Sequence, residues 1–120
     1  MKRHGLPKTK LLRQRWEFAR VYAKGARLRG EGFSLIFRDN AQPVSRLGIS
    51  VPRKAGSAVR RNRVKRLFRE VFRLNHDLFP AGSDIVVTIR PDFQENSYRC
   101  VKQAVARVVT SSGQAGRGLK

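Results

Sequence analysis

A dense run of basic side chains between Arg60 and Arg69 offers the clearest chemistry in this sequence. Six of these ten residues are Arg or Lys, and guanidinium groups bind phosphate oxygens through paired, charge-assisted hydrogen bonds. Apolar residues interrupt the run at the i, i+3, i+4 spacing of one helix face, at Val64, Leu67, Phe68, Val71 and Phe72. The pattern predicts a helix within residues 56–75, capped by Ser57, that buries one face and presents cations on the other.

This row of cations is unfavourable in an isolated helix. Positive charges near a helix N-terminus oppose the macrodipole, and like charges three or four residues apart repel each other. Glu70 is the only acid that could relieve the repulsion. A solvated charged face normally alternates both signs, whereas a phosphate backbone laid along the helix would remove the conflict. Nucleic acid is therefore the preferred partner.

The acidic, histidine and cysteine residues form no pattern that could catalyse hydrolysis. A self-sufficient nuclease needs paired carboxylates for metal ions, or a histidine pair for acid–base chemistry. The acids are scattered, and the one close pair, Asp92 and Glu95, is expected to favour the N-terminus of the following helix. Cys100 has no Cys or His at a zinc-binding spacing. We therefore expect no catalytic residue and no metal site in the chain itself.

Composition places the chain among small, strongly basic proteins. Its 120 residues suit one domain, and 27 Lys and Arg against 8 Asp and Glu give a formal net charge of +19, which attracts polyanions. The single cysteine excludes an intrachain disulfide framework and indicates a reducing compartment. No apolar run is long enough to span a membrane. These features predict a cytoplasmic protein without a membrane partner.

The N-terminal residues are predicted to form a flexible basic arm over 1–10 and then a helix over 11–24. Gly25 provides a stop for this helix. Phe18 and Tyr22 share one of its faces at the i, i+4 spacing. Taken alone, such an aromatic pair more often belongs to a core than to a binding surface.

Four strands are expected over 26–29, 33–38, 46–51 and 84–89. Alternation in 33–38 predicts a half-buried strand, whereas 84–89 is almost continuously apolar and should be a central strand covered on both faces. A last helix, capped by Asn96 or Ser97, should precede a flexible tail over 111–120. The order of elements indicates one α+β domain over 11–110, with helices packed on a small mixed sheet.

The residues around the basic helix also form a specific motif. It comprises Gly56-Ser57-Ala58-Val59, Arg61-Asn62-Arg63-Val64-Lys65-Arg66 and Leu67-Phe68-Arg69, with Leu47-Gly48-Ile49-Ser50-Val51 before it and Phe18 to Gly25 in the first helix. This combination resembles the protein subunit of bacterial ribonuclease P over nearly all of residues 12–110. The resemblance implies an αβββαβα sandwich with a left-handed crossover through the basic helix, where chain pattern alone favours a right-handed one.

The resemblance also implies two RNA partners. In that family the basic helix contacts a catalytic RNA subunit, which assigns this role to Arg61, Asn62, Arg63, Lys65, Arg66 and Arg69. A cleft between the first helix and the sheet receives the 5′ leader of precursor tRNA, which assigns Phe18 and Tyr22 to stacking and Arg53 and Lys54 to the edge of the cleft. The RNA catalyses a Mg²⁺-dependent hydrolysis, and the protein assists binding and lowers the Mg²⁺ requirement. No DNA, membrane or obligate protein partner is implied.

Two other classes of protein share some of these features. A small ribosomal protein would have the same size, charge and flexible tails. A DNA-binding protein could place the basic helix in a major groove, although no helix-turn partner precedes it. Cleavage of precursor tRNA with the catalytic RNA at low Mg²⁺ separates the ribonuclease P hypothesis from the ribosomal one. A DNA-binding protein would instead form a tight complex with duplex DNA and show sequence preference.

Overall fold

The computed structural model describes residues 10–112 and forms them into three α-helices and one four-stranded sheet. In chain order the elements are α1 (Arg15–Lys24), β1 (Ala26–Gly30), β2 (Phe33–Asp39), β3 (Arg46–Ser50), the short 3-10 helix η2 (Arg53–Ala55), α2 (Ala58–Leu74), the short 3-10 helix η3 (His76–Leu78), β4 (Ser83–Ile89) and α3 (Tyr98–Ser112). The arm predicted for 1–10 lies outside the described residues except for Lys10. The tail predicted for 111–120 also lies outside them, except for the end of α3.

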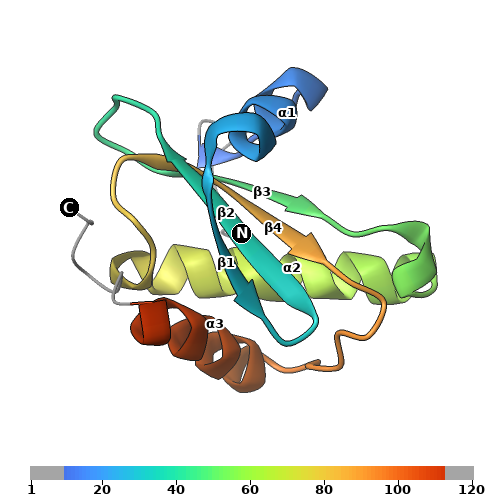
Figure 1. Ribbon diagram of the computed structural model, residues 1–120. Helices are drawn as coiled ribbons and strands as arrows, with labels where there is room; N and C mark the ends of the chain where they lie inside the picture. Colours follow the sequence, from blue (N-terminus) through green and yellow to red (C-terminus); the bar gives the residue numbers. More distant parts are fainter. Residues whose placement is uncertain (1–9, 113–120) are drawn as a thin grey trace, which may run out of the picture.

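The sheet is mixed and runs in the order β1-β2-β4-β3. β2 pairs antiparallel with β1 and β4, whereas β3 runs parallel to β4. α2 joins this parallel pair by crossing one face of the sheet, where α3 lies beside it, and α1 covers part of the opposite face (Figure 1). The central position of β4 and this sandwich of helices and sheet confirm the predicted α+β architecture.

The main core lies between the sheet and the helices α2 and α3. α2 buries the face that its sequence predicts, with Val64, Phe68, Val71 and Phe72 inside and Leu67 partly buried at the edge. The ring of Phe33 lies 5.6 Å from that of Phe68 and 5.8 Å from that of Phe93 between centroids, a favourable range for aromatic pairs. This packing fixes which face of α2 points to solvent.

The prediction that the second strand is half-buried is wrong. β2 buries both of its faces. One face points into the main core, and α1 packs over the side chains of the other face. Ile36 is 1% exposed and belongs to a second, smaller cluster with Leu12, Val21 and Val86. β2 therefore separates the main core from the cluster that anchors α1.

The first helix begins at Arg15, later than the predicted Leu11. Leu11 and Leu12 are extended instead, since the Leu12 N–H donates to the Leu47 carbonyl oxygen at 2.9 Å and Leu11 bridges to the same residue. The carboxylate of Glu17 accepts the N–H groups of Arg13 and Gln14 at 2.8 and 2.9 Å, and so satisfies donors at the helix start. The helix ends at Lys24, as predicted.

The predicted caps of the other two helices are confirmed. Ser57 Oγ accepts the N–H of Arg60 at 3.1 Å at the start of α2. Ser97 Oγ accepts the N–H of Cys100 at 3.2 Å at the start of α3. Both contacts satisfy backbone donors that a helix leaves unpaired in its first turn.

Candidate nucleic-acid interface

The outward face of α2 carries the residues predicted to bind the RNA subunit. None of the six is buried: Asn62, Arg63, Arg66 and Arg69 are exposed, and Arg61 and Lys65 are half-buried. Within residues 10–112, the guanidinium groups of Arg66 and Arg69 make no ion pair with a carboxylate. They lie about one turn apart on the same helix. Their charges are therefore available to an anion from outside the chain.

Backbone carbonyls hold the arginines at the start of α2. Arg61 Nε donates to the Gly56 oxygen at 3.1 Å, and Arg63 donates to the Asn96 oxygen at 3.4 Å. Arg60 has a structural role, because its guanidinium donates to the carbonyl oxygens of Ala55 and Phe93. A neutral carbonyl orients a guanidinium group without cancelling its charge, so the first turns of α2 stay strongly positive.

Glu70, the single acid of α2, pairs with the last arginine of the helix. Its carboxylate accepts hydrogen bonds from Arg73 at 2.7 and 3.1 Å. Both side chains are at least one-third exposed, so the pair contributes little to stability. Glu70 thus neutralises Arg73 at the C-terminal end of α2. The cations of the preceding turns have no other acidic residue in the helix to pair with.

The residues predicted for the leader lie where α1 meets the sheet, and the two aromatics differ in exposure. Phe18 is half-buried against the cluster beneath α1. Its ring fits because Gly48 has no side chain, and a Cβ there would lie 2.6 Å from Phe18 Cζ. Tyr22 is 40% exposed, and its hydroxyl lies 3.1 Å from Thr88 Oγ1. Phe18 therefore belongs partly to the core, whereas Tyr22 presents its ring to solvent.

Several polar side chains lie on the face of the sheet beside Tyr22. Thr88 stands opposite Ser34 of β2 and Ser50 of β3 in the register of the sheet, and directly opposed residues share one face. Arg90, which the sequence reasoning missed, donates to Ser34 Oγ at 2.9 Å and to the Gly30 carbonyl oxygen. This end of the sheet thus combines hydroxyl groups, of which that of Ser34 is buried, with the half-buried guanidinium group of Arg90.

Arg53 and Lys54 lie in η2, directly after β3. Both are exposed. Since β3 and β4 are parallel, η2 follows the same end of the sheet at which Thr88 meets Tyr22. The chain thus places these two cations at the end of the sheet where the predicted leader residues lie.

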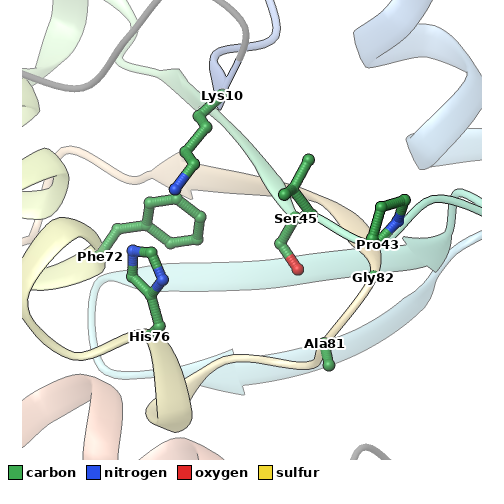
Figure 2. A pocket seen from close by; sticks show the side chains of 8 residues that line it. Lys10, Pro43, Ser45, Phe72, His76, Ala81 and Gly82 are labelled. Atoms are coloured by element: carbon green, nitrogen blue, oxygen red, sulfur yellow. The ribbon is translucent and has the colours of Figure 1, made fainter.

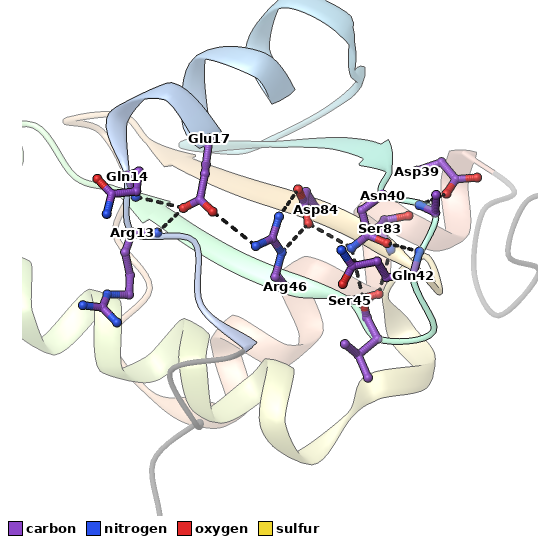
Figure 3. Close-up of polar contacts among 12 residues, drawn as sticks. Arg13, Gln14, Glu17, Asp39, Asn40, Gln42, Ser45, Arg46, Ser83 and Asp84 are labelled. Carbon is purple, nitrogen blue, oxygen red and sulfur yellow. Dashed lines mark hydrogen bonds and ion pairs between the residues drawn. The ribbon is translucent and has the colours of Figure 1, made fainter.

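An ionic network positions α1 over the sheet (Figure 3). Arg46 of β3 donates two hydrogen bonds to Asp84 of β4, at 2.9 and 2.8 Å, and a third to Glu17 of α1 at 3.2 Å. Asn40 adds a hydrogen bond to Asp84 at 2.9 Å. Asp84 is 3% exposed, and a charge buried this deeply requires such partners. The network links both the sheet and the loop after β2 to the start of α1.

The environment lowers the pKa of both carboxyl groups in this network. Burial alone would raise the pKa of Asp84, but hydrogen bonds from Arg46 and Asn40 and the charge of Arg46 outweigh it. For Glu17, burial is likewise outweighed by the N–H groups of Gln14 and Arg13 and by the Arg46 charge, so its pKa is also lowered. The same interactions raise the pKa of Arg46. All three groups are therefore charged near neutral pH.

A small cavity of about 160 Å³ lies between the loop before β3 and the end of α2 (Figure 2). It is lined by Lys10, Pro43, Val44, Ser45, Phe72, His76, Ala81 and Gly82. None of these was predicted as a site residue, and none is a carboxylate. Among residues 10–112, moreover, no group of three or more His, Cys, Asp and Glu side chains could hold a metal ion.

The sequence matches the family model for ribonuclease P over residues 6–112. The chain belongs to the ribonuclease P protein family. A ribonuclease P protein component from Desulfotalea psychrophila is 50% identical over 105 residues, which cover 88% of each chain. This membership confirms the resemblance and favours a subunit of an endoribonuclease over a ribosomal or DNA-binding protein. It also implies an RNA partner subunit and a metal-dependent ribonucleoprotein.

Solved structures of ribonuclease P proteins share the fold. The protein from Thermotoga maritima has a TM-score of 0.73 and 38% identity, covering 83% of this chain and 94% of that one. The protein from Staphylococcus aureus has a TM-score of 0.78 and 26% identity, covering 94% and 100%. The α+β class inferred from the order of elements is confirmed, whereas the individual roles of the predicted site residues stay predictions.

Among residues 10–112, no helix has both the length and the apolar character needed to cross a membrane.

Proposed function

We propose that this ribonuclease P protein binds a catalytic RNA subunit through the outward face of α2 and the 5′ leader of precursor tRNA at the junction of α1 and the sheet. The assembled ribonucleoprotein removes the leader from the tRNA in the cytoplasm. The chain supplies binding, and the RNA subunit supplies the chemistry.

The observation that carries this proposal is the row of exposed cations on α2. Its buried face anchors the helix in the main core, so the opposite face is held rigidly toward solvent. Arg66 and Arg69 are exposed there, and guanidinium groups on a rigid helix suit the phosphate backbone of a structured RNA. Binding of the RNA would remove the repulsion among these charges.

Leader binding is supported by the chemistry beside Tyr22. Proteins hold single-stranded RNA by stacking bases on exposed aromatic rings next to basic side chains. Tyr22 offers such a ring, half-buried Phe18 supports the same helix face, and Arg53 and Lys54 supply cations at the end of β3. The hydroxyl group of Thr88 fixes the tyrosine ring through its hydrogen bond.

The role of Mg²⁺ follows from electrostatics. We place the catalytic Mg²⁺ mainly on RNA ligands, which supply the phosphate oxygens that this hard cation prefers. The +19 charge of the protein offsets the repulsion between two polyanions, the catalytic RNA and its substrate. Fewer free Mg²⁺ ions are then needed to hold them together.

Reconstitution tests the proposal directly. Cleavage of precursor tRNA by the catalytic RNA should be measured at low Mg²⁺ with and without this protein. We expect the protein to raise the cleavage rate at low Mg²⁺ and to have a smaller effect as Mg²⁺ increases. Equal rates with and without the protein at every Mg²⁺ concentration would reject the proposed function.

A further inference from the structure

The one tryptophan of the chain is exposed on α1, outside the surfaces described above. Trp16 is 58% exposed. The guanidinium carbon of Arg20 lies over its ring, 5.0 Å from the centroid, which is within the range of a cation–π contact. Because Arg20 follows Trp16 by about one turn, the two side chains form a stack along the helix surface. This stack leaves a large part of the indole in contact with solvent.

Trp16 points away from the sheet. Two residues along an α-helix correspond to a rotation of about 200°, so Trp16 is nearly opposite Phe18, which packs against the cluster beneath α1. Trp16 and Tyr22 are also separated by about 9 Å along the helix axis. Trp16 and Tyr22 would therefore stack on different nucleotides.

The exposed charged residues on and just before α1 are all positive. Arg13, Arg15, Arg20 and Lys24 are exposed on or just before α1. Glu17, the only acid of the helix, is buried and paired with Arg46. Cations alone would suit any polyanion, but the flat indole beside them additionally suits a base. The surface thus complements an unpaired nucleotide, with a ring for the base and guanidinium groups for the phosphates.

We propose that Trp16 and Arg20 form a second stacking platform, which binds an unpaired leader nucleotide beyond those at the junction of α1 and the sheet. This inference rests on the proposed function, because it extends the path of the leader from Tyr22 across α1 to the outer face of that helix. Arg20 covers one face of the indole, and the base stacks on the open face. Affinity should therefore increase with leader length until the leader reaches Trp16.

Fluorescence can test this contact, because Trp16 is the only tryptophan in the chain. The holoenzyme is titrated with precursor tRNAs whose leaders increase in length, and with mature tRNA. We expect saturable quenching once the leader is long enough, and none with mature tRNA. A long leader with abasic nucleotides in its distal part should bind without quenching. Equal quenching by the abasic leader, or no quenching by any leader, would overturn the platform.

Binding of variants provides the second test. Trp16→Ala should weaken binding of long-leader substrates by about fivefold or more, and Trp16→Phe should restore most of the loss because it keeps an aromatic face. Leu74→Ala is the matched control, since Leu74 is 55% exposed against 58% for Trp16 and lies at the end of α2. The control should bind all leaders like the unmodified holoenzyme.

The outcomes separate this inference from the proposed function. If Tyr22→Ala weakens binding of leader-bearing substrates while Trp16→Ala changes nothing, the platform is rejected and the proposed function stands. If Trp16→Ala weakens mature and precursor tRNA equally, the platform is also rejected, because the contact does not involve the leader. If the unmodified holoenzyme binds mature and precursor tRNA equally well, both the leader-binding function and the platform are rejected.

Discussion

Arg46 and Asp84 form an ion pair with two hydrogen bonds that joins β3 to the start of β4. The donors Nε and Nη2 of Arg46 lie 2.9 and 2.8 Å from the two carboxylate oxygens of Asp84. The remaining terminal nitrogen, Nη1, reaches Glu17 at 3.2 Å. One guanidinium group thus connects two strands to α1, the helix that carries Tyr22. We infer that this contact sets the position of the proposed leader-binding residues on α1.

Replacing Arg46 by Met should lower the free energy of unfolding by about 3 kcal/mol, because it leaves the buried carboxylate of Asp84 without its main partner. Urea unfolding in the absence of RNA measures the change. Arg73→Met is the matched control: its partner Glu70 has a side chain 39% exposed, so the loss should be about 0–1 kcal/mol. Equal losses in both variants would show that burial does not strengthen the Arg46–Asp84 pair.

Acid should destabilise the protein through Asp84 and Glu17. Their pKa values are lower in the folded chain than the ordinary 3.8 and 4.5, so the unfolded chain binds more protons as the pH approaches those values. The stabilisation by these two groups is complete above the ordinary values and is lost as the pH falls through the lowered ones. Asp84→Asn removes one of these groups, so its unfolding free energy should depend less steeply on pH below about 4. Parallel pH profiles for the two proteins would contradict the assignment.

The two faces of α2 should respond differently to truncation. Arg66→Ala removes an exposed cation and should weaken binding to the catalytic RNA, with a smaller salt dependence and an unchanged melting temperature. Leu67→Ala, at the edge of the core, should instead lower the free energy of unfolding by about 2 kcal/mol. The comparison needs RNA-binding isotherms at several salt concentrations and a thermal melt of each free variant. Similar behaviour of the two variants would show that the assigned faces are wrong.

Gly48→Ala should disturb α1 because the new methyl group would overlap the ring of Phe18, whose Cζ lies 2.6 Å from the Cβ position. We expect a loss of about 1–3 kcal/mol in the free energy of unfolding and weaker binding of precursor tRNA to the holoenzyme. Adding Phe18→Leu should recover part of the stability, since the smaller side chain leaves room for the methyl group. No recovery in the double variant would indicate that the clash lies elsewhere.

The parts of the fold that the sequence predicted well are those with strong local periodicity. The apolar residues of α2 repeat at helical spacing, so the buried face and the exposed cations could both be assigned from the sequence. β4 is a continuous apolar run, which predicted a strand covered on both faces. In both cases the pattern within one element was enough to predict which of its side chains are buried.

The parts that could not be predicted depend on contacts between distant segments. Leu12 is extended because it bonds to Leu47, and nothing near Leu12 signals this pairing. Ile36 is buried because α1, a separate element, packs over it. Arg46 meets partners 29 and 38 residues away in the chain. The spacing of Gln14 and Glu17 was the one local signal for the true helix start, since a Glu three residues after the cap often bonds back to it.

The leader and the RNA subunit should bind to different elements of the protein, and Tyr22→Ala separates the two contacts. Tyr22 is 40% exposed, so its removal should leave the melting temperature of the free protein nearly unchanged. Tyr22→Phe, which loses only the hydroxyl contact with Thr88, is the control that keeps the aromatic ring.

One holoenzyme is assembled with Tyr22→Ala and the other with the unmodified protein. Binding curves are measured for each holoenzyme with precursor tRNA and with mature tRNA. We predict a loss of about 1–3 kcal/mol per stacked base for precursor tRNA, no change for mature tRNA, and unchanged affinity of the protein for the catalytic RNA. Equal losses for precursor and mature tRNA would contradict a leader contact at Tyr22, because mature tRNA has no leader to stack on the tyrosine.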